Sequence, residues 1–504
     1  MIAHQKAILI IIISLLWFGA EAQKRNSIWC FGDSAGIDFN GGIPSPINTS
    51  LDTRGSCVSI ADTNGQLLFY ANTRAATAGQ TTGLVWNRNH QLMLNGDSIA
   101  GDGWYDEMII IPNPADDSLY YLFSIGIVIP FGLEYSIIDM RGDGTLGGII
   151  QKNFQLQTFK MVDCLTAIKH GNGRDWWLIF RESPVFPGTD NNSWYSYLIT
   201  PSGISNVTLQ NVGTLNSTNA GSLCFNPSGN KICFVNTISM IEIYDFDRCT
   251  GTISNPVNIE PEVMVLPYPY YWSCAFSPNG QYLYVSGSTT PSTLWQFDTW
   301  AANIDSTKTL LWQVSYPPYT AGALKLAPDN KIYMSCAWSD SVGNFNYPYP
   351  DSAFYLENMN LGVINSPDAA GMACDFQPWS FYLDGKRTYW GLPNNPDYEL
   401  GAVTGNICDS LTGIKNNEQI IKNELFVYYN SPWQKAFINA KGLKGRNVKM
   451  SAYDLLGNVI YTEERKLSSQ YFTKDLNMAA FAKGMYIVNL VTEKERLVKK
   501  FIKD

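Results

Sequence analysis

The sequence predicts an all-β protein in which a seven-bladed β-propeller is followed by a small immunoglobulin-like β-sandwich. Two observations lead to this prediction: a β-hairpin motif recurs over most of the chain, and the composition changes near residue 425. The clearest hairpin spans residues 274–288 (CAFSPNGQYLYVSGS). An apolar strand ends at Phe276, residues 277–280 suit a tight turn, and a second strand begins at Tyr282.

The hairpin motif occurs seven times with an almost constant spacing. The last apolar residue before each turn marks a copy, and these markers are Ile60, Ile110, Ile168, Phe225, Phe276, Leu326 and Phe376. Successive markers are 50, 58, 57, 51, 50 and 50 residues apart. A period of about 50 residues in an all-β sequence is typical of a propeller with one blade per repeat. We therefore expect seven blades of mostly four antiparallel strands.

Residues 1–22 have the features of a cleavable signal peptide. Lys6 precedes a 14-residue, almost wholly apolar run at residues 7–20, and a small-x-small site ends at Ala22. We expect cleavage between Ala22 and Gln23. The run is shorter than the ~20 apolar residues of a spanning helix, and no second run of this kind follows. The mature chain is therefore predicted to have no membrane span.

The predicted propeller extends over residues 23–392, and its two ends are expected to meet. Residues 28–39 form a short aromatic segment ahead of the first complete repeat, and such an extra strand usually completes the last blade of a propeller. We expect it to pair beside the blade marked by Phe376. Residues 393–424 are polar and unpatterned, which is typical of a linker. Residues 425–504 contain alternating strands broken by Gly-Asn and Lys-Gly turns, which favours a compact β-sandwich.

The two predicted domains differ in charge. Residues 23–424 contain 20 Lys and Arg against 36 Asp and Glu, whereas residues 425–504 contain 14 basic against 7 acidic residues. An acidic propeller repels phosphate backbones, and it lacks the clustered Lys and Arg that nucleic-acid binding uses. We therefore expect no nucleic-acid partner.

Cysteine and histidine usage limits the chemistry of the mature chain. Five of the ten cysteines lie one to four residues before a repeat marker, which suits small buried side chains, so we expect mostly free thiols. The local pairs Cys224–Cys233 and Cys233–Cys249 are the two candidates for a disulfide in an oxidising compartment. Only two histidines remain after signal removal, and the acidic turns lack a complete series of calcium ligands. We expect no bound metal and no cofactor.

Four carboxylates stand where they can face the central channel of a propeller. Each precedes a repeat marker by one to five residues, and they are Asp106, Glu107, Asp163 and Asp375. One interpretation is that they form hydrogen bonds that tie neighbouring blades together. The other is that they act in pairs on a glycosidic bond, as the two acids of glycoside hydrolases do. We favour the structural interpretation.

The last 80 residues closely resemble a family of secretion signals. The matching pieces are YDLLG at residues 453–457, the Lys-Gly-Met-Tyr turn at 483–486 and the lysine-rich end at 499–503. By these motifs the domain resembles the type A carboxy-terminal sorting domain of the type IX secretion system. One departure is that the family's opening Pro-Asn-Pro stands here as Asn-Ser-Pro at 430–432. The resemblance implies that the sorting signal uses Asp454, Gly457, Gly484, Tyr486, Lys499, Lys500 and Lys503.

This resemblance also implies partners and a route. The outer-membrane translocon would read the domain and a sortase would remove it, with cleavage within residues 393–424. The terminal lysines are expected to complement an acidic receptor surface, while Gly484 permits a turn and Tyr486 anchors the strand that follows. The protein is then expected to pass through the periplasm and to reach the outer-membrane surface or the medium.

Segments near the amino terminus, at residues 31–40, 55–73 and 85–96, resemble the first repeats of large exported β-propeller proteins of Bacteroidetes. That resemblance implies no defined activity. We therefore predict an exported, non-catalytic binding or scaffold module with an unknown protein or glycan ligand. The alternative is a hydrolase or lyase that acts on extracellular polysaccharide. Several acids close together in a deep pocket would favour the alternative.

Overall fold

The computed structural model of the chain is dominated by β-strands. It describes residues 24–503 except the segments 75–80, 127–131, 185–187, 264–268, 289–290, 316–318, 341–346, 406–407, 409–423, 431–433 and 468–471. The predicted signal peptide, with Ala22 and Gln23, lies outside the described residues. Within the described part, helix is limited to the 3-10 turns Asp143–Thr145, Asp305–Thr307 and Gly371–Cys374. No helix in this part is long and apolar enough to cross a membrane.

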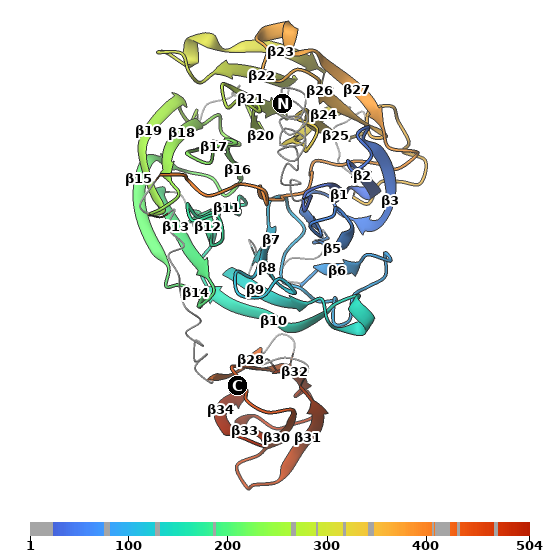
Figure 1. The fold of residues 1–504 in the computed structure, drawn as a ribbon, viewed down its shortest axis with the longest axis vertical. Coiled ribbons are helices and arrows are strands. Elements are labelled where there is room, and N and C mark those ends of the chain that lie inside the picture. Colours follow the sequence, from blue (N-terminus) through green and yellow to red (C-terminus); the bar gives the residue numbers. More distant parts are fainter. Residues whose placement is uncertain are drawn as a thin grey trace, which may run out of the picture.

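Seven sheets of the described residues are arranged around a common centre (Figure 1), as expected for a seven-bladed propeller. Six of them, blades 1 to 6, follow one another along the chain. Their strands are, in blade 1, β4 (Cys57–Ala61), β5 (Leu67–Asn72) and β6 (Leu84–Asn87); in blade 2, β7 (Met108–Pro112), β8 (Leu119–Gly126), β9 (Gly132–Asp139) and β10 (Gly148–Gln157); in blade 3, β11 (Thr166–Lys169), β12 (Trp176–Arg181), β13 (Asn191–Thr200), β14 (Gly203–Ile204) and β15 (Thr208–Asn216); in blade 4, β16 (Gly221–Phe225), β17 (Lys231–Asn236), β18 (Ile241–Asp247) and β19 (Thr252–Glu260); in blade 5, β20 (Tyr271–Phe276), β21 (Tyr282–Gly287), β22 (Ser292–Asp298) and β23 (Thr309–Val314); and in blade 6, β24 (Tyr319–Leu326), β25 (Ile332–Trp338), β26 (Asn360–Ile364) and β27 (Phe376–Tyr382).

The repeated hairpin forms the two innermost strands of each of these six blades. In blade 5, Phe276 pairs with Leu283 across the turn, and the N–H of Gly280 donates to the carbonyl oxygen of Ser277 at 2.8 Å. Gly280 has a φ of 77°, a conformation that glycine adopts readily because it lacks a Cβ. The other five markers confirmed on inner strands are Ile60, Ile110, Ile168, Phe225 and Leu326.

The seventh marker was predicted to begin an inner strand, and that prediction is wrong. Phe376 opens β27, the outermost strand of blade 6, where it pairs with Ile364 of β26. The reason is a long connection within this blade, because β25 ends at Trp338 and β26 begins only at Asn360. Blade 6 therefore uses more sequence than its neighbours, and its last strand falls one period after the marker Leu326.

Blade 7 is instead built from the amino-terminal end of the propeller. Its strands are β1 (Ile28–Phe31), β2 (Asp33–Asp38) and β3 (Ser45–Asp52). The segment was expected to pair beside the blade marked by Phe376 and to complete it, and that expectation is wrong, because β1 pairs with β2 in a separate sheet. Blade 6 is nevertheless its neighbour: the rings of Trp29 on β1 and Tyr333 on β25 meet edge to face with centroids 5.8 Å apart.

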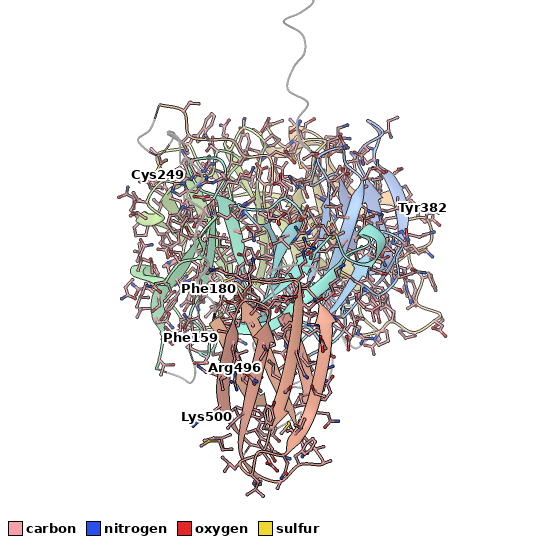
Figure 2. All side chains as sticks on the ribbon, turned by 60° about the horizontal axis from the view of Figure 1, so that its bottom comes forward. Phe159, Phe180, Cys249, Tyr382, Arg496 and Lys500 are labelled. Carbon is pink, nitrogen blue, oxygen red and sulfur yellow. A yellow bond between two sulfur atoms is a disulfide. The ribbon has the colours of Figure 1, made fainter. Side chains whose placement is uncertain are left out.

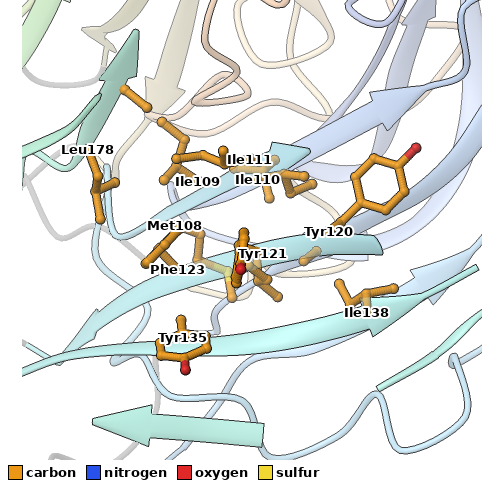
Figure 3. Close-up of a cluster of buried hydrophobic side chains, with 14 of the residues drawn as sticks. Met108, Ile109, Ile110, Ile111, Tyr120, Tyr121, Phe123, Tyr135, Ile138 and Leu178 are labelled. Atoms are coloured by element: carbon orange, nitrogen blue, oxygen red, sulfur yellow. The ribbon is translucent and has the colours of Figure 1, made fainter. Parts of the chain in front are cut away.

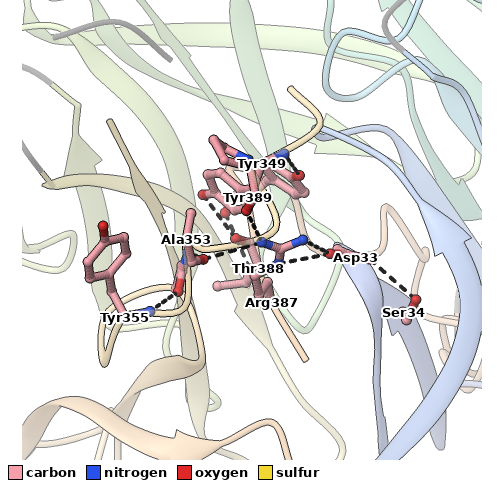
Figure 4. A network of polar contacts seen from close by, with 10 residues as sticks. Asp33, Ser34, Tyr349, Ala353, Tyr355, Arg387, Thr388 and Tyr389 are labelled. Carbon is pink, nitrogen blue, oxygen red and sulfur yellow. Dashed lines mark hydrogen bonds and ion pairs between the residues drawn. The ribbon is translucent and has the colours of Figure 1, made fainter. Parts of the chain in front are cut away.

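The carboxy-terminal end of the propeller completes blade 7. Arg387 forms a backbone bridge with Asp33, and its Nη2 lies 2.7 Å from the Asp33 carboxylate (Figure 4). The guanidinium also donates from Nη1 to the carbonyl oxygen of Pro350 at 2.9 Å. Arg387 and Asp33 are 354 positions apart in the sequence. The two ends of the propeller sequence therefore do meet, although not through the strands that were expected.

The core of the propeller lies between the blades. In blade 2, Met108, Ile109, Ile110 and Ile111 of β7 are all fully buried, and they pack with aromatic side chains such as Phe123 of β8 (Figure 3). A strand that is apolar on both sides is expected here, because each sheet is covered on both faces by its neighbours in the ring. The apolar runs that identified the repeats are these inner strands.

The carboxy-terminal domain is a two-sheet β-sandwich, which confirms the predicted architecture of a small β-domain. One sheet contains β28 (Glu424–Asn430), β29 (Lys435–Lys441) and β32 (Phe472–Asn477), and the other contains β31 (Val459–Lys466), β30 (Asn447–Tyr453), β33 (Gly484–Thr492) and β34 (Arg496–Lys503). Its core is formed by buried side chains on both sheets, among them Ile438, Met450, Val488 and Phe501.

Candidate ligand site in the propeller channel

Residues 387–405 form a strap that crosses the middle of the ring (Figure 1). Residues 387–396 are almost completely buried. The predicted linker 393–424 therefore began too early, since its first residues belong to the packed propeller. The segment looked like a linker because Asn-Asn-Pro is a common loop sequence, but here the asparagines bond to the inner strands.

The asparagine side chains of the strap satisfy polar backbone groups of several blades. Asn394 Nδ2 donates to the carbonyl oxygens of Met108, at 3.0 Å, and Leu165, at 2.7 Å. Asn395 Oδ1 accepts from the Ser59 N–H at 2.9 Å. Because buried backbone groups need partners, these contacts fix the strap in the channel.

The far end of the strap is tied to blade 4. Arg248 Nη2 donates to the carbonyl oxygen of Gly401 at 2.6 Å, and Cys249 forms a disulfide with Cys408 (Figure 2 labels Cys249). Neither candidate local disulfide is present among the described residues: Cys224 and Cys233 are free thiols, and Cys249 pairs with a residue 159 positions away. Spacing along the chain carried no signal for such a distant partner.

A cavity of about 710 Å³ lies in the channel beside the strap. Inner strands of blades 3 to 6, their hairpin turns and the strap line it, including Thr166, Ser222, Cys224, Cys274, Lys325 and Asn395. Pro227, Pro278 and Pro328 of three hairpin turns also line the cavity, so it extends to the end of the ring where these turns lie. Its volume falls within the range of ~300–1,000 Å³ that is typical of small-molecule sites.

Aromatic side chains meet at the opposite end of the channel. The rings of Tyr105, which precedes β7, and Trp272, on β20, are 4.1 Å apart in an edge-to-face contact. Trp390 of the strap lies 6.3 Å from each of these two rings. Because edge-to-face contacts between aromatic rings are favourable, this cluster holds the strap against blades 2 and 5.

Five charged side chains line the cavity. Lys24, Asp397 and Glu399 are exposed, whereas Asp106 and Lys325, which are of opposite sign, are half-buried. Asp106 Oδ2 accepts a hydrogen bond from the Ser222 hydroxyl at 3.1 Å. Lys325 Nζ donates to the backbone oxygen of Asn395 at 2.5 Å. Removal from bulk water raises the pKa of Asp106 to about 6 and lowers the pKa of Lys325. Each group therefore has a neutral partner and a side that faces the cavity.

Glu107 and Asp163 are fully buried close to Asp106, but they hold the backbone rather than line the cavity. Glu107 Oε1 accepts from the Asp102 N–H at 3.1 Å and its Oε2 from the Gly103 N–H at 3.0 Å, and burial raises its pKa to about 7. Asp163 Oδ2 accepts from the Tyr105 N–H at 2.9 Å. Burial and the neighbouring acids raise the pKa of Asp163 well above its usual value. Glu107 Oε2 also accepts from the hydroxyl of Thr73, which follows β5 of blade 1, and Asp163 joins the segments that precede β7 and β11. These longer-range contacts favour the interpretation that the acids tie neighbouring blades together.

Asp375 was the fourth candidate for facing the channel, but it is exposed at the outer side of blade 6. Its carboxylate accepts from Asn365 Nδ2 at 3.1 Å and from Gln377 Nε2 at 2.6 Å. The position follows from the misplaced seventh marker, because the strand after Asp375 is an outer strand.

Lys325 and the strap asparagines were not among the predicted site residues. Lys325 stands directly before the marker Leu326, so a search for basic as well as acidic residues beside the markers would have found it. Asn394 and Asn395 gave no such signal, because their partners are inner strands far away in the sequence.

The sequence-predicted sorting residues fall into two groups, and the first forms turns. Asp454 Oδ1 accepts from the N–H groups of Leu456 and Asn458 at 2.9 and 2.8 Å, and Gly457 has a φ of 85°. Gly484 has a φ of 150° at the start of β33. Asp454 and the two glycines therefore shape the loops of the sandwich.

The second group belongs to the last strands. Tyr486 is buried, stacks on Phe501 and donates its hydroxyl to the Ala482 carbonyl at 2.6 Å. Lys503 is also buried, and its Nζ donates to the carbonyl oxygens of Met478 and Phe481. The expectation that Lys503 faces a receptor is thus wrong, because its amine caps backbone groups inside the domain. Lys499 and Lys500 are exposed (Lys500 is labelled in Figure 2).

In the described part of the chain, no group of three or more His, Cys, Asp or Glu side chains is placed to hold a metal ion.

Comparison with known proteins identifies one part of the chain. Residues 429–504 match the secretion system C-terminal sorting domain, so the chain carries such a domain. None of the curated proteins compared matches the chain in sequence. The sorting domain implies that the protein interacts with the secretion system and is exported to the cell surface or beyond it.

Several solved structures resemble the propeller. A candidate 6-phosphogluconolactonase from Bacteroides fragilis is 12% identical with a TM-score of 0.45, and the alignment covers 73% of this chain and 97% of that chain. The periplasmic gluconolactonase of Pseudomonas aeruginosa is 10% identical with a TM-score of 0.34, over 81% of this chain and 99% of that chain. A quinoprotein alcohol dehydrogenase-like protein from Bacteroides thetaiotaomicron is 10% identical with a TM-score of 0.37, over 73% and 75% of the two chains. At this level of similarity, these proteins give no information about activity.

Proposed function

We propose that this chain is an exported, non-catalytic binding protein, delivered by type IX secretion, whose propeller holds a small polar ligand in the channel cavity. The observation that carries the proposal is the pair Asp106 and Lys325, which face one cavity of about 710 Å³. A lysine ammonium has three donors and a carboxylate accepts at two oxygens. Both groups therefore offer hydrogen bonds to a ligand beyond their contacts with Ser222 and Asn395.

The binding proposal is tested with the purified mature protein and a panel of monosaccharides, oligosaccharides, amino acids and dipeptides. Thermal shift finds the panel members that stabilise the protein, and calorimetry measures their affinity. Lys325→Met should weaken binding by about tenfold or more, because a charged hydrogen bond contributes about 1.5–3 kcal/mol. Lys331→Met is the matched control, since Lys331 lies on the same hairpin but bonds to Asn365 outside the cavity. Binding that is equal in wild type and Lys325→Met would overturn the proposal.

A hydrolase or lyase acting on extracellular polysaccharide is the second candidate function. It is favoured by Asp397 and Glu399 of the strap, which line the same cavity as Asp106. Against it, Glu107 and Asp163 are engaged by backbone amides. Release of reducing ends or unsaturated products from a polysaccharide panel, lost in Asp106→Asn or Asp397→Asn, would support this function over simple binding.

The sorting route is tested in cells. Deletion of residues 495–504 removes β34 and with it the core residue Phe501, so the sandwich would lose its fold while the propeller keeps its own core. The truncated chain should accumulate in the periplasm, and fractionation would detect it there. The double variant Lys499→Ala, Lys500→Ala tests recognition of the domain surface without unfolding the sandwich, because both lysines are exposed. It should also reduce export, whereas Lys494→Ala on a nearby turn should not.

We place removal of the sorting domain by the sortase after Cys408. Residues 393–396 are buried or half-buried in the channel, Tyr398 is buried, and Cys408 is bonded to Cys249. A cut in this region would have to act on packed chain, whereas a cut between residues 409 and 424 leaves the strap attached to the propeller. Carboxy-terminal sequencing of the exported protein tests this position, and a terminus before Cys408 would contradict it.

A further inference from the structure

Three cysteines of blades 4 and 5 meet at the wall of the channel cavity. Cys224 on β16 and Cys233 on β17 are direct cross-strand partners. Cys274 lies on β20 of the next blade, and its Sγ is 3.0 Å from Cys224 Sγ. The length of a disulfide bond is about 2.0 Å, so a small movement would bring these two sulfur atoms to bonding distance. Cys224 and Cys274 both line the cavity.

The thiol of Cys224 differs from the other described thiols. Burial raises the pKa of Cys30, Cys164 and Cys336. Burial acts on Cys224 in the same direction, but hydrogen bonds from Cys233 and Cys274 and the nearby Lys325 ammonium outweigh it and lower its pKa. The thiolate is the reactive form of cysteine, and Cys224 is half-buried beside the cavity. The Cys224 sulfur is therefore both reactive and accessible from the cavity.

We propose that Cys224 and Cys274 form a redox-active pair in the channel wall, which is oxidised by small disulfides that carry a carboxylate and enter the cavity. Cys224 is the attacking thiolate and Cys274 the second thiol. Cys233 is a positioning residue, which donates a hydrogen bond to the Cys224 sulfur. The Lys325 amine favours an anionic disulfide, because its charge lies near Cys224 in the same cavity. This site stands on the thiol geometry and is independent of which ligand the propeller binds.

The reaction takes place in two exchange steps. The Cys224 thiolate attacks one sulfur of the small disulfide, which forms a mixed disulfide on Cys224 and expels one thiolate. The Cys274 thiol gives its proton to that leaving thiolate and attacks the Cys224 sulfur, which forms the Cys224–Cys274 disulfide and expels the second thiolate. The two cysteines lose two electrons, and the small disulfide is reduced by the same two electrons to two thiols.

The test uses 5,5′-dithiobis(2-nitrobenzoate), a disulfide with two carboxylates, and the mature full-length chain after mild reduction and desalting. Wild type should release two equivalents of thionitrobenzoate in a fast phase and keep none bound. Cys274→Ser should release one equivalent and retain the other on Cys224, as seen by peptide mass. Cys224→Ser should lose the fast phase, whereas Cys336→Ser, at a buried thiol elsewhere, should keep it. Peptide mass also separates any contribution from Cys249 and Cys408.

Two further measurements test the proposal: the selectivity of Cys224 for anionic over neutral disulfides, and the oxidation state of Cys224 and Cys274 in the exported protein. Lys325→Met should slow the reaction of Cys224 with the anionic probe. It should slow the reaction with a neutral disulfide, 2,2′-dithiodipyridine, by a smaller factor. Peptide mapping of the wild-type protein collected after export, which needs no variant, should find Cys224 bonded to Cys274. A fast phase that persists in Cys224→Ser, or Cys224 recovered as a free thiol both after export and after the probe reaction, would overturn the proposal.

Discussion

Blades 1 to 6 and blade 7 are built in different ways. Each of the six is made from one continuous stretch that starts with the same hairpin, whereas blade 7 combines β1–β3 with Arg387 from the other end of the propeller sequence. The repeated stretches supply the packed ring, since their inner strands are apolar and buried. The strap that begins at blade 7 crosses the channel and forms part of the cavity wall. The regular part of this chain therefore forms the scaffold, and the irregular part shapes the site.

The largest expected loss of stability is in the repeated blades. Phe276→Ala in blade 5 should lower the free energy of unfolding by about 3–5 kcal/mol, because it leaves a cavity in the core between blades. Urea denaturation followed by tryptophan fluorescence measures the loss. Val257→Ala on the outer strand β19, where the side chain is 47% exposed, should stay within about 0.5 kcal/mol of wild type. Equal losses in the two variants would mean that the inner strands do not carry the packing.

The next largest loss of stability is expected at the far end of the strap, where the disulfide lies. The double variant Cys249→Ser, Cys408→Ser should destabilise the protein by about 2–4 kcal/mol, because it removes a crosslink over 159 residues. Denaturation of the variant Cys224→Ser under reducing and non-reducing conditions gives a second comparison, because this variant cannot form a Cys224–Cys274 bond and loses only the Cys249–Cys408 bond on reduction. If the strap were held by its asparagines and aromatic residues alone, neither measurement would change the free energy of unfolding.

A smaller loss is expected where the two ends of the propeller meet. Arg387→Met should cost about 1.5–3 kcal/mol, because it removes charged hydrogen bonds to Asp33 and to the Pro350 carbonyl. The Asp33 side chain is 28% exposed, so water compensates part of the lost ion pair. A double-mutant cycle with Asp33→Asn isolates the coupling between the two side chains. A coupling near zero would show that blade 7 does not depend on this contact.

Sequence reasoning succeeded where a local pattern repeats and failed where partners are distant. The hairpins around Phe276 and Leu326 were predictable, because turn residues and apolar strands lie side by side in the sequence. The sorting domain was predictable from its turns and its terminal motif, although burial of Lys503 was not, since it depends on carbonyls of another loop. The Cys249–Cys408 bond and the channel contacts of Asn394 join segments that no local pattern connects.

The smallest expected effect compares the same residue type in the two kinds of region. Asn279 lies in the repeated hairpin turn of blade 5, where its Oδ1 accepts from the Gln281 N–H at 2.8 Å in an exposed position. Asn394 lies in the strap, where its Nδ2 donates to two carbonyl oxygens of blades 2 and 3. Water can replace the lost partner at Asn279, but the two carbonyls at Asn394 face the strap. We therefore expect Asn394→Ala to cost about 1–2 kcal/mol and Asn279→Ala about 0.5 kcal/mol. Hydrogen exchange adds a sharper readout, because Asn394→Ala should increase exchange in the strap and leave the blade 5 hairpin unchanged. If Asn279→Ala cost as much as Asn394→Ala, the turns of the repeat would contribute as much as the strap, and the division between scaffold and site would fail.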